Sequence, residues 1–325
     1  MPTFRHGKKT AILFGSNNLS QYLNSVGVAN SIDTNETTTF GNDAKTYITG
    51  IESATFSLSG LYEGSENDPV LNNALNQDTF TTITSGSSTG TNVIAFTVPT
   101  MTIPFGAGQI VTVAGTSQST HNVTGVIASS PAPTVTSFSL VTNAVVASAS
   151  STGGTATNSV IQTATVAQEG LTAGTMCFLA GTRVKSYEIK SSVADVIQAN
   201  VECEADNGLD SGKILQGATT INTIGANNGA TLDNGASLGA TTRGYVAHLH
   251  VTANTWTGTA TFAIQHSTDG SSWNTLDTFT VVPASSIYQE RKVSTSATVN
   301  RYVRALATLA SGTGSVTYSM AISRR

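Results

Sequence analysis

Apolar and polar side chains alternate in short runs along most of the chain. In residues 55–62 the side chains of Phe56, Leu58, Gly60 and Tyr62 fall on one side, and those of Thr55, Ser57, Ser59 and Leu61 fall on the other. A period of two residues is typical of a β-strand with one buried face. The shorter apolar run 10–14 ends at the turn-forming sequence GSNN and predicts a second strand nearby.

The same two signals recur through the rest of the sequence, separated by Gly, Ser and Asn turns. They predict strands over residues 79–84, 93–98, 109–113, 122–127, 135–141, 145–146, 160–168, 173–179, 184–190, 193–203, 244–252, 258–266, 273–282, 290–294, 300–309 and 314–323. We therefore expect an all-β protein.

One stretch reads as a helix. Asp68 is a capping residue, Pro69 suits the first helical position, and Val70, Leu71, Ala74 and Leu75 share one face. The pattern predicts one short helix over residues 69–76.

The connection from Asp33 to Gly50 is long and polar. It holds several charges and threonines, and few of its side chains are large and apolar. Connections of this length are uncommon in compact domains unless they serve a function. Two interpretations stay open: a solvated loop or β-ribbon, and an arm that docks on another subunit.

Two groups of residues stand out. The first is His6-Gly7-Lys8, residues 19–23, Asp33, Glu36 and residues 38–41, 44–48 and 57–64, and the second runs from residues 187–196 through 208–212. Together they cover about a third of the chain, and they resemble the tail tube (major tail) proteins of long-tailed bacteriophages, chiefly those of phages of actinobacteria and their relatives.

This resemblance implies a tail-tube-type β-sandwich or barrel with one short helix. Six copies would form a ring in which the inner sheets join into a continuous barrel, and rings would stack into a tube that conducts DNA during ejection. Expected partners are further copies, a tape-measure protein and other tail proteins, and DNA passing without sequence-specific binding, with no membrane. The product would be a virion tail assembled in the host cytoplasm. The expected inter-ring contacts are Asp33, Glu36, Phe40, Asp43, Lys45 and Tyr47.

The resemblance and the changes in composition together predict five segments. Residues 1–91 would hold an N-terminal arm, the stacking arm and the first half of the tube domain, and residues 158–215 would hold its second half. Between them, residues 92–157 would be an inserted uncharged β-rich segment. Residues 216–240 would be a linker, and residues 241–325 an outward-facing jelly-roll or Ig-like sandwich.

Charge is scarce in this chain. Only 10 % of its 325 residues are charged, its net charge is −4, and residues 79–168 contain no Asp, Glu, Lys or Arg. No strongly basic field exists to hold nucleic acid, which suits a wall past which DNA slides. No signal peptide or membrane span is indicated. Cys177 and Cys203 are expected to be reduced core residues.

Candidate chemistry is sparse as well. His248 and His250 share a strand face at a spacing that suits zinc, but a third ligand is not evident. The acidic set Glu202, Glu204, Asp206 and Asp210 lacks the spacing of a calcium loop. The carboxylate pairs Glu52 with Glu63 and Asp33 with Glu36 have nothing to place them in a glycosidase cleft. We predict no catalytic, cofactor-binding or metal-binding residues, and no enzyme.

A second hypothesis stays open. The chain would be a decoration, receptor-binding or carbohydrate-binding protein of a phage tail or capsid, with host-surface glycans as ligands of its C-terminal part. Trp256 and Trp273 are the candidate glycan contacts, although tryptophans in small sandwiches more often pack in the core or at its rim.

Overall fold

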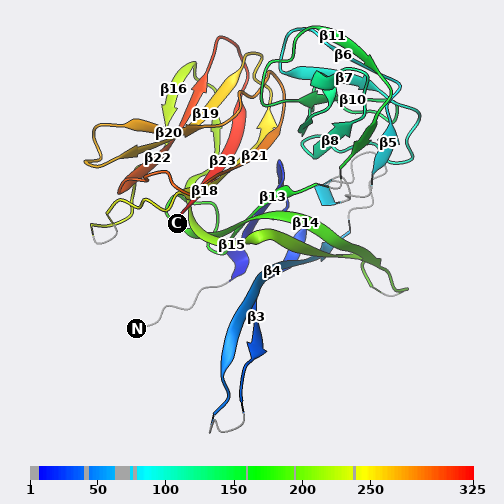
Figure 1. Cartoon of the computed structure of the whole chain (residues 1–325). Helices are drawn as coiled ribbons and strands as arrows, with labels where there is room; N and C mark the ends of the chain where they lie inside the picture. Colours follow the sequence, from blue (N-terminus) through cyan, green and yellow to red (C-terminus); the bar gives the residue numbers. More distant parts are fainter. Residues whose placement is uncertain are drawn as a thin grey trace.

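The computed structural model describes residues 7–39, 44–62, 74–75, 79–158, 160–193, 195–236 and 239–325. Within these residues the chain forms three antiparallel sheets and two short 3-10 turns, η1 (Gly7–Lys9) and η2 (Ser119–His121). The prediction of an all-β fold is confirmed. Figure 1 shows two bodies side by side above a long curved sheet, from which a hairpin projects.

The largest sheet, here the main sheet, has ten strands among the described residues. Its continuous order is β2-β1-β13-β14-β15-β23-β18-β21, and β3 and β4 branch from β15. Its strands are β1 (Ala11–Phe14), β2 (Asn17–Asn18), β3 (Leu23–Glu36), β4 (Tyr47–Leu61), β13 (Gln162–Ala167), β14 (Met176–Lys190), β15 (Gln198–Ile221), β18 (Tyr245–Asn254), β21 (Tyr288–Ser294) and β23 (Val316–Arg324).

A second sheet, the cover sheet, packs on one end of the main sheet. It contains β16 (Gly225–Asn228), β17 (Leu232–Asp233), β19 (Ala260–Ser267), β20 (Asn274–Thr278) and β22 (Tyr302–Leu309). Between the sheets lie alternate side chains of β18 and β23 on one side and of β19 and β22 on the other, around Trp256, Phe262 and Tyr318. Burial of one side chain in two along each strand explains the period of two in the sequence.

The structure corrects the expectation that residues 216–240 form a linker. Residues 216–221 complete β15 and pair with β23, and β16 and β17 follow in the cover sheet. Gly, Asn and Thr dominate this stretch, and their composition predicts a loop. The segment forms strands because pairing with neighbouring strands outweighs the weak strand propensity of these residues. The C-terminal sandwich is thus built from residues on both sides of position 240.

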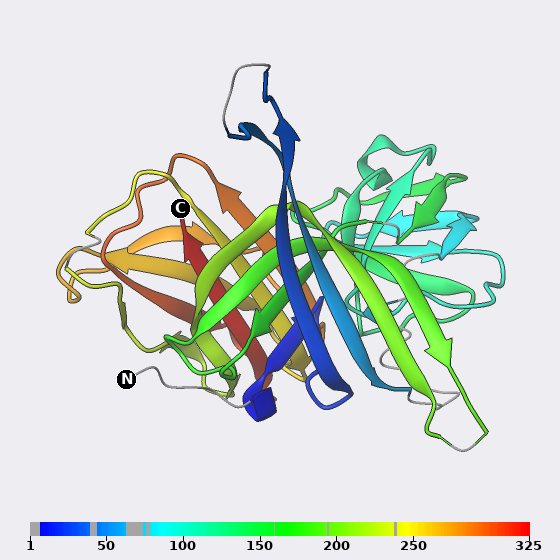
Figure 2. The ribbon, with the colours of Figure 1, turned by 90° about the horizontal axis from the view of Figure 1, so that it is seen from below.

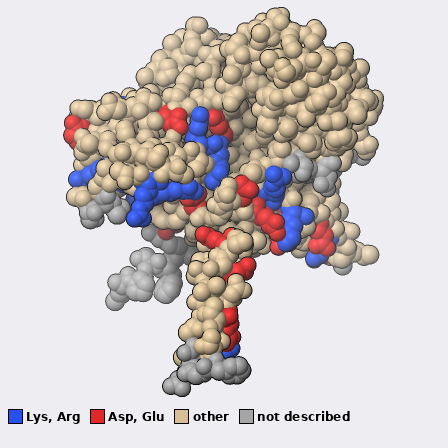
Figure 3. Space-filling model, viewed as in Figure 1, with Lys and Arg blue, Asp and Glu red and all other residues tan. Residues whose placement is uncertain are grey.

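The third sheet holds the residues that lack charge. It runs β11-β6-β7-β10-β9-β8-β12-β5 and is formed by β5 (Phe80–Thr82), β6 (Ser85–Ser88), β7 (Val93–Thr97), β8 (Ile110–Ala114), β9 (Thr124–Ile127), β10 (Ser137–Val141), β11 (Ala149–Thr152) and β12 (Thr155–Thr157). It begins at Phe80, before the expected boundary at residue 92. The body made by this sheet shows no blue or red atoms in Figure 3.

The predicted helix over residues 69–76 is described only at Ala74 and Leu75. Both are helical and buried, and they pack with Ile12, Phe14 and Phe56 in the core beneath the branch of the main sheet. The remainder of the predicted helix lies outside the described residues.

Candidate functional site

Four strand segments form a small antiparallel sheet at the branch of the main sheet, which we call the open sheet. It consists of β3, β4, residues 198–204 of β15 and residues 183–190 of β14, in the order β3-β4-β15-β14. One row across it runs Ser25, Ser59, Asn200, Glu188, and the next runs Gly27, Ser57, Glu202, Ser186. The sheet is therefore in register from edge to edge.

The two faces of the open sheet differ. One face carries Phe56, Leu58, Ala199, Val201 and Cys203, which are buried against β1, β13 and the helical pair 74–75. The other face carries small hydroxyl and carboxylate side chains and no large apolar ones in its central rows: Ser25, Gly27, Ala29, Thr55, Ser57, Ser59, Asn200, Glu202 and Glu204. This second face, the polar face, is not covered by any other described part of the chain.

Charges on the polar face are balanced. Its β14 and β15 segments hold three bases, Arg183, Lys185 and Lys190, and three acids, Glu188, Glu202 and Glu204. Lys185 contacts Glu204 at 3.0 Å and Lys190 contacts Glu188 at 3.1 Å. The hydrogen bond from Lys185 to Glu204, with the nearby charge of Glu202, raises the pKa of Lys185. A surface of paired charges has little attraction for phosphate.

Both edges of the open sheet lack a strand partner within the described part of the chain. β3 pairs only with β4, and β13 reaches only residues 178–182 of β14, which leaves the edge at residues 185–190. The N–H of Tyr62 donates to the carbonyl of Ile197 at 2.9 Å. In an antiparallel sheet the N–H and C=O groups of one residue both point to one neighbouring strand, and those of the next residue both point to the other. The contact between Tyr62 and Ile197 therefore shows which neighbouring strand each residue of these segments bonds to.

It follows that the backbone groups of residues 198, 200 and 202 of β15 form hydrogen bonds with those of residues 190, 188 and 186 of β14. Tyr187 and Ile189 therefore direct their N–H and C=O groups away from the sheet. On the opposite edge Val26, Val28 and Asn30 of β3 do the same. Both edges present a row of backbone donors and acceptors that can accept a further strand.

The tip of the β14–β15 hairpin exposes a group of apolar side chains. They are Leu61, Ile189, Val193, Val196 and Ile197. A cluster of this kind at a sheet edge is typical of a protein–protein contact.

The β3–β4 hairpin extends beyond the body (Figure 1). We call residues 30–39 and 44–53 the projecting hairpin. Strand β4 pairs with β15 over residues 55–61, and its residues 47–54 extend past that pairing, a length of about 26 Å at about 3.3 Å per residue. Figure 2 shows this hairpin and the β14–β15 hairpin pointing in different directions.

Most of the residues predicted to make inter-ring contacts lie on the projecting hairpin. Asp33 and Glu36 are on β3, Tyr47 is on β4, and Lys45 contacts Glu36 at 3.1 Å. Phe40 and Asp43 lie outside the described residues. The hairpin also exposes Ile32 and Tyr47 by about half, together with Ile48 and, at 80 %, Ile51. Local sequence does not predict that these apolar side chains remain uncovered.

The two candidate glycan contacts have different surroundings. Trp256 is 1 % exposed and lies in the core between the main and cover sheets, so its ring cannot stack on a sugar and that prediction is wrong. Trp273 is partly exposed, and the guanidinium of Arg304 lies 4.2 Å from its ring centre. The glycan contact at Trp273 stays a prediction.

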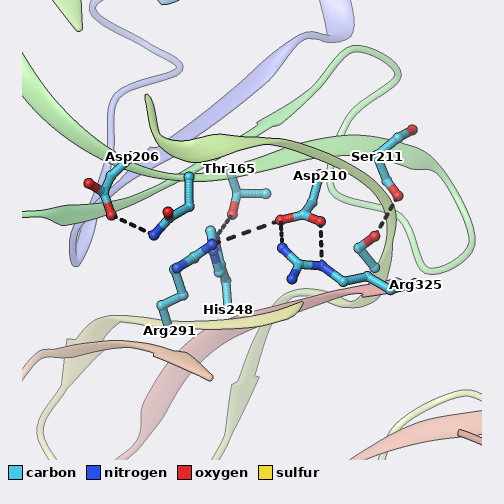
Figure 4. A network of polar contacts seen from close by, with 9 residues as sticks. Thr165, Asp206, Asp210, Ser211, His248, Arg291 and Arg325 are labelled. Carbon is cyan, nitrogen blue, oxygen red and sulfur yellow. Dashed lines mark hydrogen bonds and ion pairs between the residues drawn. The ribbon is translucent and has the colours of Figure 1, made fainter. Parts of the chain in front are cut away.

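The pair His248 and His250 lies in a buried polar seam between β18 and β13, in which Figure 4 shows His248 and Thr165. The hydroxyl of Thr165 lies 3.0 Å from His248 Nδ1 and 2.9 Å from His250 Nε2, and His250 Nδ1 lies 2.5 Å from the carbonyl of Gly15. Burial lowers the pKa of both histidines, so both rings are neutral near pH 7. Since a carbonyl only accepts, a neutral His250 donates from Nδ1 to Gly15 and accepts from Thr165 at Nε2, and the Thr165 oxygen then accepts from His248 Nδ1. These bonds hold β13 and the turn after β1 against β18.

The acidic candidates do not gather around a cation site. Asp210 receives two hydrogen bonds of 3.0 Å from Arg325 and lies 3.8 Å from Arg291, whereas Asp206 binds the side chain of Asn207 (Figure 4). Among the described residues no group of three His, Cys, Asp or Glu side chains is placed to hold a metal ion. Cys177 and Cys203 are buried, free thiols, and burial raises the pKa of each to about 12.

The histidine seam predicts acid sensitivity. Burial lowers the pKa of His250 to about 4, and burial with the charges of His250 and Arg291 lowers that of His248. In the unfolded chain these histidines take up a proton near pH 6.5, so the unfolded chain binds more protons than the folded chain between pH 6.5 and 4. The free energy of unfolding should therefore fall through this range, by about 3 kcal/mol from His250 alone at pH 4.

Urea unfolding of the wild type and a His250→Gln variant, each at pH 7 and pH 4.5, measures this effect. Glutamine retains a donor and an acceptor but does not titrate, so the variant should lose less stability on acidification. An equal loss in both proteins would contradict the assignment.

Comparison with known proteins gives few matches. No protein-family model and no curated protein matches the chain. Among solved structures, the chain is similar to the crystal structure of the SPP1 Dit (gp 19.1) protein, described as a paradigm of the hub adsorption apparatus in phages that infect Gram-positive bacteria. The similarity covers 96 % of this chain and 98 % of that chain, at 9 % identity and a TM-score of 0.29. A TM-score this low does not establish a common fold. No helix in the described part of the chain is long and apolar enough to cross a bilayer.

Proposed function

We propose that the protein is a tail tube subunit of a long-tailed bacteriophage, and that copies join through the open sheet into rings that stack into a tube. The observation that carries this proposal is the open sheet itself, with four antiparallel strands, two unpartnered edges and one polar face. The resemblance of residues 4–64 and 187–212 to tail tube proteins names the family.

Strand direction is compatible with ring closure. In the order β3-β4-β15-β14 the strands alternate, so β14 of one copy and β3 of the next also run antiparallel. Each copy uses two different edges, and such a head-to-tail contact either closes into a ring or grows into a helix. A closed ring leaves no exposed edge, which removes the aggregation hazard of both edges. The number of copies in the ring, six, is taken from the resemblance to tail tube proteins.

The polar face would line the lumen. Its small hydroxyl side chains and balanced charges offer no fixed site for phosphate, so DNA would slide past the wall. The two other bodies lie on the far side of the open sheet and would face outward (Figure 1). A tape-measure protein would occupy the lumen before ejection.

Solution mass tests ring formation. Native mass spectrometry of the purified protein should show a species that contains six chains of 33.4 kDa, together with its multiples. A monomer at every concentration would contradict the proposal, and a trimer would favour a spike or decoration protein.

A further inference from the structure

A pocket with a volume of about 560 Å³ opens beside the C-terminal end of β23. Its walls combine four basic side chains, Lys213, Arg243, Arg324 and Arg325, with the apolar side chains of Met176 and Leu232. We call it the basic pocket. Its volume lies within the range of about 300–1,000 Å³ that is usual for binding sites.

The charges of the basic pocket are only partly balanced. Arg325 is neutralised by Asp210 through two hydrogen bonds of 3.0 Å. Asp233 lies near Lys213, but its carboxylate receives two hydrogen bonds of 2.7 Å from Arg301. Arg243 and Arg324 therefore add positive charge that the acids near the pocket do not match.

Arg324 is fixed at the wall of the pocket. Its Nη2 donates to the carbonyls of Gly239 and Val299, at 2.6 and 3.0 Å, which holds the guanidinium in place. Burial lowers the pKa of this group. The two carbonyls carry no formal charge, so the positive charge of Arg324 in the pocket wall is available to an arriving carboxylate.

The projecting hairpin has the complementary chemistry. It carries three acids, Asp33, Glu36 and Glu52, against one described base, Lys45, which pairs with Glu36, so its described residues are acidic overall. It also exposes the apolar side chains of Ile32, Tyr47, Ile48 and Ile51. Within one chain the two do not meet, because Figures 1 and 2 both show strands β3 and β4 extending out of the body, apart from the C-terminal end of β23 beside which the pocket lies. A second copy can supply the hairpin.

We propose that the basic pocket is the socket for the projecting hairpin of another copy, with carboxylates against Arg243 and Arg324 and apolar side chains against Met176 and Leu232. This inference rests on the proposed function, in which the other copy belongs to the neighbouring ring. A free phosphate or nucleic acid fits less well, because it would leave the apolar walls of the pocket without a partner.

Cross-linking between two chains tests the contact directly. Asn35→Cys places a thiol between the hairpin acids, and Thr242→Cys places one on the pocket rim, and neither change removes a charge. The native thiols are buried and have a raised pKa, so background reaction is low. A short bifunctional maleimide added to an equal mixture should give a two-chain product that is absent from either variant alone.

Charge reversal provides the second arm of the experiment. Lys213→Glu with Arg243→Glu should lower the yield of the two-chain product at least about tenfold, because acids then face acids. Lys213→Arg with Arg243→Lys keeps the charge at the same positions and should preserve the yield.

The outcomes separate the two proposals. Rings and tubes without the cross-link, or a yield that charge reversal does not change, would overturn the socket and leave the tail tube intact. A charge-dependent cross-link in a preparation that forms no rings would support the socket and overturn the tail tube.

Discussion

Replacement of Ile189 by proline is expected to abolish ring formation and to leave the monomer folded. The N–H of Ile189 points away from β15, so the substitution removes no hydrogen bond of the β14–β15 ladder. Proline is tolerated on an edge strand whose N–H faces outward, but it prevents another strand from pairing there. The exposed side chain of Ile189 lies at the hairpin tip, so little buried area is lost.

Two matched variants make this result specific. Glu188→Pro removes an N–H that bonds to β15 and should destabilise the monomer itself, by about 1–3 kcal/mol for the ladder hydrogen bond that is lost. Ile189→Thr keeps the edge N–H and strand propensity, and it should form rings. Size-exclusion chromatography with light scattering reports the assembly state, and circular dichroism reports the fold. Rings of normal size from Ile189→Pro would show that this edge does not join copies.

Deletion of residues 36–45, with a short Gly-Ser closure, should leave soluble rings or monomers but no tubes. The deletion shortens the projecting hairpin and removes the Glu36–Lys45 pair, and it leaves the ladder between β4 and β15 untouched. Because the described residues of the projecting hairpin are all exposed and none belongs to the core, the body should remain folded.

Replacement of residues 36–45 by a Gly-Ser segment of equal length is the control for loop length, and it should fail to stack in the same way. Negative-stain images of all three proteins give the readout. Normal tubes from the deletion variant would refute a stacking role for the hairpin.

The local strands were readable from the sequence because the buried and exposed positions alternate. Residues 55–62 gave the correct faces for β4, with Phe56 and Leu58 buried and Ser57 exposed. The pairing of β4 with β15 could not be predicted, since it joins residues far apart in the chain. Edge and centre strands have the same local pattern, so the open edges emerged only from the sheet order.

Strand β15 shows why some elements were missed. It runs for 24 residues through Asn207 and Gly208, both at positive φ, and through register shifts near Gln216. Glycines and irregularities of this kind are typical of loops, so the strand was divided into a strand and a linker. Bulges let a single strand bend and pair with β4 along one half and with β23 along the other.

The candidate site was predicted in part. The long polar connection marked the projecting hairpin, because polar composition without core residues identifies a segment outside the body. The basic pocket was not predicted, because Lys213, Arg243 and Arg324 come from three separate strands and loops. The consecutive arginines at 324 and 325 were the only local signal.

Electron cryo-microscopy of the purified protein at high concentration tests the central claim most directly. We predict hollow tubes of stacked rings, with an inner barrel in which β14 of each copy lies beside β3 of the next and the polar face lines the lumen. Discrete monomers, trimers or spikes, or tubes in which the open sheet faces outward, would contradict this account.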